Sequence, residues 1–151
     1  MTDPLPSTFP ATGRLAGIDY GTVRVGVAVC DAGRMIASPY ENYNRRTESL
    51  DRQYFARLAQ EERLVGFVVG LPLHMSGEES PKSHEARQFG RWLAEITGRP
   101  VVFHDERLTS TLAEDLLMEA GFTKKGRQQR LDKLAAQMIL SAYLELTKSE
   151  T

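Results

Sequence analysis

The chain has 151 residues, of which 41% are hydrophobic and 26% are charged, and its formal net charge is −1. This length suits one domain with one core, and the composition is that of an ordinary globular protein. Because the chain as a whole is not basic, any contact with nucleic acid has to come from local clusters of cations. The single cysteine, Cys30, excludes an internal disulfide and a cysteine-rich zinc site.

The two ends of the chain are expected to be tails. Residues 1–14 contain three prolines and no apolar signal core, so we expect a flexible N-terminal tail, and residues 148–151 form a short C-terminal one. Residues 15–147 then make a single domain. No segment reaches the apolar length of a membrane span, so no membrane contact is expected, and the lone cysteine fits a reducing, cytoplasmic location.

Apolar spacing along the chain alternates between the periods of strands and of helices. It predicts strands at residues 15–20, 23–31, 35–43, 64–70 and 100–106. It predicts helices at residues 47–62 and 82–97, from Thr111 to just before Gly121, and through the amphipathic segment 131–143. The segment TKKGRQQR, residues 123–130, is expected to be a polar, basic loop.

The connections between these elements predict the topology. Short turns join the first three strands, which therefore form an antiparallel meander, whereas helices separate the later strands, which are therefore parallel. The fold class is thus α/β, with a mixed five-stranded sheet flanked by helices.

Acidic side chains stand where several of these elements begin or end. Asp19 lies near the end of the first strand, Asp105 and Glu106 end the fifth, and Asp132 opens the last helix. In α/β sheets, sites form beyond the carboxyl ends of parallel strands. A carboxylate within an apolar strand also costs free energy unless something pairs with it. These four acids are therefore candidates for one shared site.

The spacing of Asp132 indicates that it faces the interior. It precedes Ala135, Ala136 and Ile139 by three, four and seven residues, which places it on the buried side of the helix. Neighbouring inward carboxylates repel one another unless cations neutralise them, and oxygen ligands select Mg²⁺ or Mn²⁺. Three carboxylates supply about −3 against about +4 for two such ions, which leaves positive charge to receive a phosphate.

Four blocks of sequence resemble the YqgF (RuvX-like) family, whose members are described as pre-16S rRNA nucleases and as Holliday junction resolvases. They are GIDYGTVRVGVAVCD at 17–31, VVGLPLHMSGEES at 68–80, DERLTSTLAEDLL at 105–117 and LDKLAAQMILSAYL at 131–144. The resemblance runs from about Leu15 to Leu146 and implies a ribonuclease H-like fold. It implies that Asp19, Glu106 and Asp132 are both the catalytic residues and the metal ligands. Asp105 is then left with a structural role.

Basic residues adjoin these acids. Arg24 and Arg107 flank two of them, either as phosphate contacts or, as we favour, as ion-pair partners. A basic run directly before Asp132 is expected to track a nucleic-acid backbone. It contains Lys124, Lys125, Arg127 and Arg130.

The resemblance implies a metal-dependent nuclease that cleaves structured RNA, with 5′-end processing of precursor 16S rRNA as its role. One alternative is a Holliday junction resolvase that acts on branched DNA, which would require a homodimer to cut two strands symmetrically. Another is a nucleic-acid-binding factor without catalysis. A third, an actin-like ATPase that shares the GIDYGT turn, needs two such lobes, and 151 residues supply one.

Overall fold

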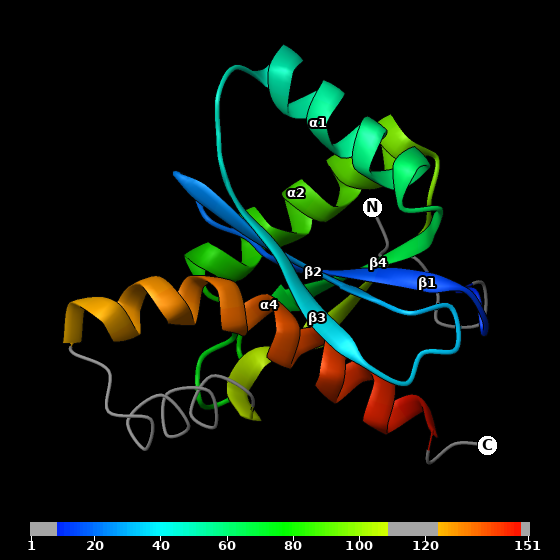
Figure 1. Cartoon of the computed structure of the whole chain (residues 1–151). Coiled ribbons are helices and arrows are strands. Elements are labelled where there is room, and N and C mark those ends of the chain that lie inside the picture. Colours follow the sequence, from blue (N-terminus) through cyan, green and yellow to red (C-terminus); the bar gives the residue numbers. More distant parts are fainter. Residues whose placement is uncertain (1–8, 109–123, 149–151) are drawn as a thin grey trace.

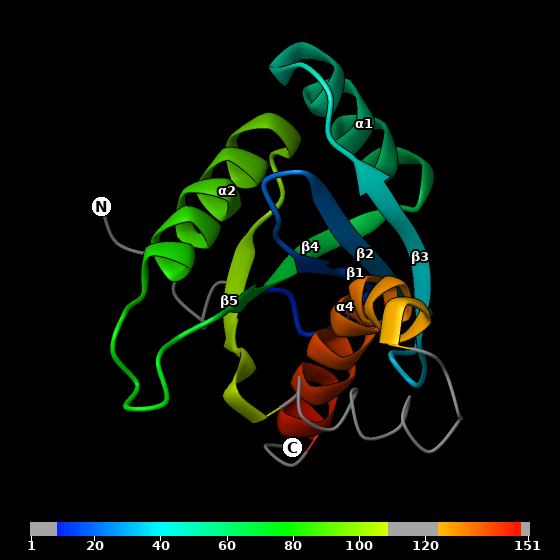
Figure 2. The ribbon, with the colours of Figure 1, turned by 90° about the vertical axis from the view of Figure 1, so that its left-hand side faces the viewer.

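The computed structural model describes residues 9–108 and 124–148, with the backbone alone for residue 108 and residues 124–133. Within this part of the chain, five strands form one sheet in the order β3-β2-β1-β4-β5 (Figures 1 and 2). The strands are β1 Arg14–Asp19, β2 Arg24–Cys30, β3 Ala37–Asn44, β4 Leu64–Leu71 and β5 Val101–Asp105. β1, β2 and β3 pair antiparallel, whereas β1, β4 and β5 pair parallel. The predicted mixed sheet is therefore confirmed.

Helices cover both faces of the sheet. They are α1 Glu48–Glu61, α2 Pro81–Thr97 and α4 Lys124–Lys148, and a 3₁₀ turn, η2 Glu106–Leu108, follows β5 directly. α2 begins with a capping box between Ser80 and Ser83 and ends at Gly98, whose φ of 69° suits glycine. The predicted helix after Thr111 lies outside the described residues.

One prediction about the last helix was wrong. Residues 124–130 were expected to be a loop, but they are the first turns of α4. The segment was assigned to a loop because it is polar, yet lysine, glutamine and arginine are all good helix formers, and only Gly126 disfavours a helix there. The polarity of the segment therefore says nothing against a helix.

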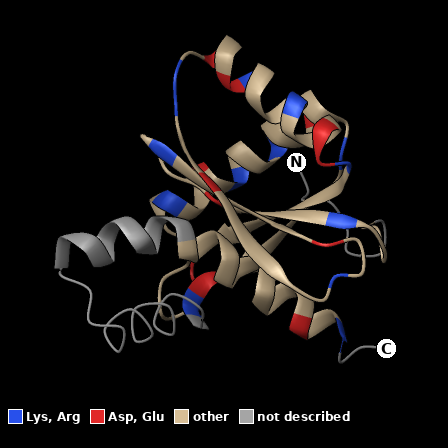
Figure 3. Cartoon of the chain, viewed as in Figure 1, with Lys and Arg blue, Asp and Glu red and all other residues tan. Residues whose placement is uncertain are grey.

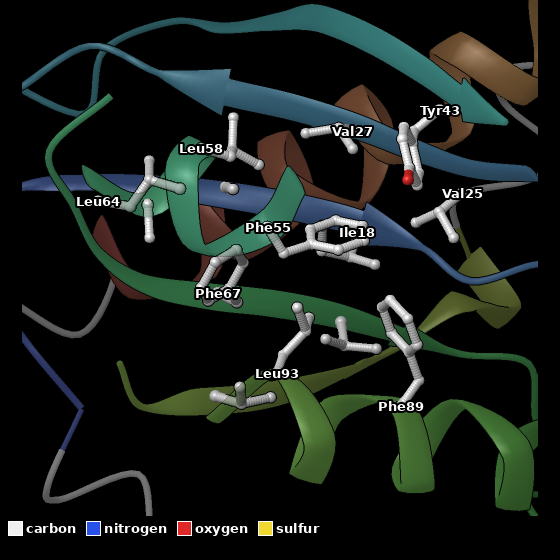
Figure 4. Packing of buried hydrophobic residues seen from close by; sticks show 14 of the residues in the cluster. Ile18, Val25, Val27, Tyr43, Phe55, Leu58, Leu64, Phe67, Phe89 and Leu93 are labelled. Carbon is white, nitrogen blue, oxygen red and sulfur yellow. The ribbon is translucent and has the colours of Figure 1, made fainter. Parts of the chain in front are cut away.

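Two apolar layers hold the sheet between the helices. On one face, side chains such as Ile18, Phe55 and Phe89 pack between the sheet and helices α1 and α2 (Figure 4). On the other face, Leu15 and Val68 of the sheet pack against Ile139 and Leu140 of α4. Successive strand residues alternate between these two layers, as the pleat of a strand requires. Both faces of the sheet are thus buried, which explains the continuous apolar runs in β1 and β4.

Gly17 allows α4 to lie directly on β1. A Cβ at this position would be 2.7 Å from the carbonyl oxygen of Ala136 and 2.7 Å from Cβ of Leu140. Real Cβ atoms do not come that close to backbone atoms, so a larger residue would push the helix away from the sheet. The distance between β1 and α4, and with it the position of the first turns of α4, therefore depends on this glycine.

Part of the segment expected to be a flexible tail packs against the domain. Arg34 donates hydrogen bonds from Nη2 to the carbonyl oxygen of Pro10 (2.9 Å) and from Nε to that of Gly13 (2.7 Å). The ring of Phe9 meets that of Tyr143 edge-on at 5.8 Å. The bounds of the predicted domain, residues 15–147, stay a prediction. Among the described residues, no helix combines the length and the apolar character needed to cross a membrane.

Candidate active site

The candidate site lies where the parallel strands end. β1 ends at Asp19 and β5 ends at Asp105, and Glu106 follows as the first residue of η2. Because β1, β4 and β5 run parallel, their carboxyl ends share one edge of the sheet. β2 is antiparallel to β1, so it begins at this same edge, with Arg24. The topology therefore brings segments from both halves of the chain to this edge.

Asp19 belongs to the face of the sheet that α4 covers. Gly17 lies against α4, and Asp19 is two residues further along the same strand, so its side chain points to the same side. The backbone of Asp19 is still paired within the sheet, opposite Gly26 of β2. Its side chain is half-buried. Asp19 is thus a carboxylate on a rigid strand, at the point where the strand leaves the core.

Glu106 reaches the same face over Gly70 of β4. A Cβ at Gly70 would be 2.8 Å from both Cγ and Cδ of Glu106 and 2.5 Å from Cδ1 of Ile139. The Glu106 side chain thus occupies the space that any other residue at position 70 would fill. It therefore lies beside Gly70 of β4, near Ile139 of α4.

The pKa of the Glu106 carboxyl rises to about 8. Burial is the largest cause, and the negative charge of Asp19 is the second, while the nearby Lys82 ammonium acts in the opposite direction. The contribution of Asp19 to this pKa fits the two carboxylates lying near one another at this edge of the sheet. A half-buried pair of carboxylates of this kind favours either a shared proton or a bound cation.

Asp132 is described by its backbone alone. Its backbone is helical in α4, one turn before Ala136, on the helix face that Ala136 and Ile139 pack against the sheet. Its side chain lies outside the described residues, as do those of Lys124, Lys125, Arg127 and Arg130 of the basic run. Among the side chains that the structure describes, no group of three or more metal-binding residues occurs. The role of Asp132 therefore stays a prediction.

Asp105 is paired with Arg107. Oδ1 of Asp105 accepts from the Arg107 backbone N–H (2.9 Å), and Oδ2 accepts from Nε (2.8 Å). The hydrogen bond from the Arg107 side chain is the main reason why the pKa of Asp105 is lowered. Arg107 also donates from Nη1 to the carbonyl oxygen of Met75 (3.2 Å). The pair thus ties the loop of residues 72–80 to the end of β5, beside Glu106.

Two further residues of this region were not singled out by the sequence. Lys82, in the first turn of α2, is exposed, and its positive charge lowers the pKa of Glu106. Basic residues at the start of β2 and at the start of α2 lie on the side of the molecule where β1 ends (Figure 3). Gly70 gives Glu106 its space. Gly70 lies within the block 68–80 that carries the family resemblance, and Lys82 lies two residues after it. No local pattern, however, shows that Gly70 is the neighbour of Glu106, which comes 36 residues later.

His104 is half-buried, and burial lowers its pKa. It lines a hollow of about 630 Å³ between β5, the C-terminal half of α4 and residues 9–11, together with Phe9 and Tyr143.

Trp92 packs against Phe55 and Phe89 and donates from Nε1 to Glu48 (3.1 Å), so it belongs to the core, as its helical position indicates.

Known proteins resemble this chain over most of its length. A family model described as "RuvX: Holliday junction resolvase" matches residues 13–146. A protein of Rhodopirellula baltica named "Putative pre-16S rRNA nuclease" is 50% identical over 137 residues, which cover 91% of this chain and 79% of the relative. A protein of the same name from Rhodobacter capsulatus is 39% identical over 143 residues, which cover 95% and 90%.

Solved structures show the fold. T. thermophilus RuvC in complex with Holliday junction substrate matches with a TM-score of 0.54 at 15% identity, over 89% of this chain and 96% of that one. The fowlpox virus Holliday junction resolvase matches with a TM-score of 0.51 at 13% identity, over 88% and 99%. At these identities the likeness concerns the fold alone. It is the ribonuclease H-like fold that the sequence resemblance implies.

Proposed function

The chain belongs to the RuvX family, which is described as a family of Holliday junction resolvases, and from this membership we propose that it is a metal-dependent nuclease. Its proposed substrate is structured RNA, and its proposed role is the 5′-end processing of precursor 16S rRNA, in the cytoplasm. The choice of RNA follows the name of the relatives that are 50% and 39% identical to it. The observation that carries the chemistry is the convergence of Asp19 and Glu106 at the carboxyl edge of the sheet.

The two carboxylates fit a hard divalent cation. Both present oxygen ligands, and the pKa of Glu106 is raised first by burial and second by the negative charge of Asp19, which a bound cation would offset. We propose that Asp19, Glu106 and Asp132 hold Mg²⁺ or Mn²⁺, with two ions leaving a net positive charge to receive a phosphate. Bound there, the ions would supply Lewis-acid chemistry, which activates water and stabilises charge on the leaving oxygen.

The chain's own residues set the geometry of this reaction. Asp19 is held by the pairing of β1 with β2, so its carboxylate needs little rearrangement to bind. Glu106 is confined between Gly70 and Ile139, which restricts its rotamers. Both acids therefore approach their ligand from fixed positions.

Basic side chains around this edge are proposed to bind the RNA backbone. Arg24 is exposed at the start of β2, and Lys82 is exposed at the start of α2. Arg107 already holds Asp105 and the loop of residues 72–80, so its contribution is to order that loop. The basic run at the start of α4 is proposed to contact phosphates further along the strand. It consists of Lys124, Lys125, Arg127 and Arg130.

The test is cleavage of matched substrates by the purified protein. An RNA that spans a precursor 16S 5′ end and a four-way DNA junction are each incubated with Mg²⁺ or Mn²⁺. We expect cleavage of the RNA, and we expect Asp19→Asn to abolish it without loss of folding. Glu61→Gln, an exposed change on α1, is the control and should leave cleavage unchanged.

The outcome also separates the alternatives. Cleavage of the DNA junction but not of the RNA would favour a resolvase, which the description of the family model supports. That activity would also require a homodimer, because a symmetric cut needs two active sites. Binding without cleavage of either substrate would identify a non-catalytic factor, and full activity of Asp19→Asn would refute the assigned site.

A further inference from the structure

The turn directly after Asp19 is tightly built. Residues 20–23 connect β1 to β2, and a Cβ at Gly21 would be 2.2 Å from the carbonyl oxygen of Arg24, so only glycine fits there. The tip of the turn faces solvent, and Val23 is 65% exposed. Because Asp19 directly precedes this turn, a substrate phosphate bound at Asp19 would lie beside residues 20–23. Its conformation therefore bears on how the substrate is positioned.

Arg45 holds this turn from the junction between β3 and α1. Its backbone N–H donates to the carbonyl oxygen of Val23 (2.9 Å). Its Nη1 donates to the hydroxyl of Tyr20 (3.3 Å) and to the carbonyl oxygen of Gly21 (3.4 Å). The guanidinium also lies 5.5 Å from the ring centres of Tyr20 and Phe89. One residue thus contacts the turn at three of its four positions.

Asp51 in turn orients Arg45. Asp51 lies in the first turn of α1 and is only 1% exposed. Its carboxylate accepts from Nε of Arg45 (3.3 Å), from the backbone N–H of Arg46 (2.9 Å) and from the hydroxyl of Tyr43 (2.7 Å). Burial, followed by the bond to Asp51, raises the pKa of Tyr43 to about 12, so its hydroxyl remains a donor at neutral pH. A buried carboxylate with this many donors is rigidly held.

We propose that Arg45, oriented by Asp51, is a positioning residue that fixes the backbone of residues 20–23 for contact with the substrate's sugar-phosphate backbone beside Asp19. This inference rests on the proposed function. Sheet pairing between β1 and β2 ends at Asp19 and Gly26, so it does not order the turn itself. The side chain of Arg45 meets this need, because its planar fork bonds Asp51 on one side and the turn on the other.

The test compares Arg45→Met with Arg57→Met, a change on α1 whose arginine is 72% exposed and makes only a 3.9 Å ion pair with Glu61. The bond to Val23 comes from the backbone N–H of residue 45 and is kept in Arg45→Met. ¹⁵N relaxation of the metal-free protein therefore reports the order of Tyr20 and Gly21, the residues that the Arg45 side chain contacts. In Arg45→Met we expect their order parameters to fall from about 0.85, the rigid value, to below about 0.6. We expect kcat/KM for RNA cleavage to fall by about 10- to 100-fold at temperatures where the variant is folded. Arg57→Met should change neither.

Arg45→Lys covers the case in which Arg45→Met fails to fold. Lysine keeps the positive charge opposite Asp51, but it lacks the fork that bonds the turn at the same time, so the turn should still lose order. Unchanged order parameters in either folded variant would overturn the proposal. A disordered turn with unchanged kcat/KM would also overturn it, because Arg45 would then be merely structural. If the wild type cleaves neither RNA nor DNA, the proposed function fails, while the relaxation data still decide whether Arg45 orders the turn.

Discussion

Replacing Glu106 by glutamine is expected to stabilise the metal-free protein at alkaline pH. In the folded protein the pKa of Glu106 is about 8, against an ordinary value of 4.5. The folded state therefore binds this proton more tightly than the unfolded state does. The resulting stabilisation is fully present below pH 4.5 and is lost as the pH rises through 8. Glutamine has no such proton to lose, so its variant lacks this pH dependence.

The magnitude follows from the size of the shift. Each unit of pKa difference corresponds to about 1.4 kcal/mol. Between about pH 5.5 and about pH 8.5, Glu106 should thus remove roughly 3 kcal/mol from the free energy of unfolding, as an upper limit because its carboxyl keeps some contact with solvent. This is a large share of the stability of a domain of this size.

The assay is urea unfolding of the wild type and Glu106→Gln at several pH values, with EDTA present. The difference in unfolding free energy between the two proteins should grow with pH in favour of the variant. Glu61→Gln, on the exposed side of α1, should follow the wild type at every pH. If the free energies of unfolding of the wild type and Glu106→Gln depended on pH in the same way, the argument would be refuted, because Glu106 would then ionise freely in the folded state. Mn²⁺ should restore the stability of the wild type at high pH and have less effect on the variant.

Two further changes probe the framework of the site. Gly17→Ala places a Cβ 2.7 Å from Cβ of Leu140, so α4 has to shift; we expect a loss of about 1–3 kcal/mol in urea unfolding together with reduced cleavage. If Gly17→Ala were less stable but cleaved the substrate as fast as the wild type, the position of α4 would not matter to the site. Arg107→Met removes a partner of Asp105 that is about one third exposed, so stability should change by no more than about 1 kcal/mol. Its expected effect is faster hydrogen exchange in residues 74–78, and unaltered exchange there would contradict the role assigned to this pair.

Much of the architecture could be predicted from local pattern. Each predicted strand and helix that the structure describes lies within two residues of its observed bounds, apart from α4, which begins seven residues before and ends five residues after the predicted segment 131–143. Alternation and helical spacing are local properties, because they depend on which face of an element is buried. The lengths of the connections also predicted how the strands pair. Strands joined by short turns are antiparallel, and strands separated by a helix are parallel. The start of α4 was missed because polarity and helix propensity disagree in residues 124–130, and polarity was given the greater weight.

The sequence by itself determined the elements, their order and the candidates Asp19 and Glu106. Only the tertiary structure decided that these two acids, 87 residues apart, repel one another over Gly70. It also decided that Arg45 holds the turn after Asp19. Such contacts depend on strand order, on register and on the depth at which α4 packs. Those are set by the sum of many weak apolar contacts across the whole domain, which no local pattern encodes.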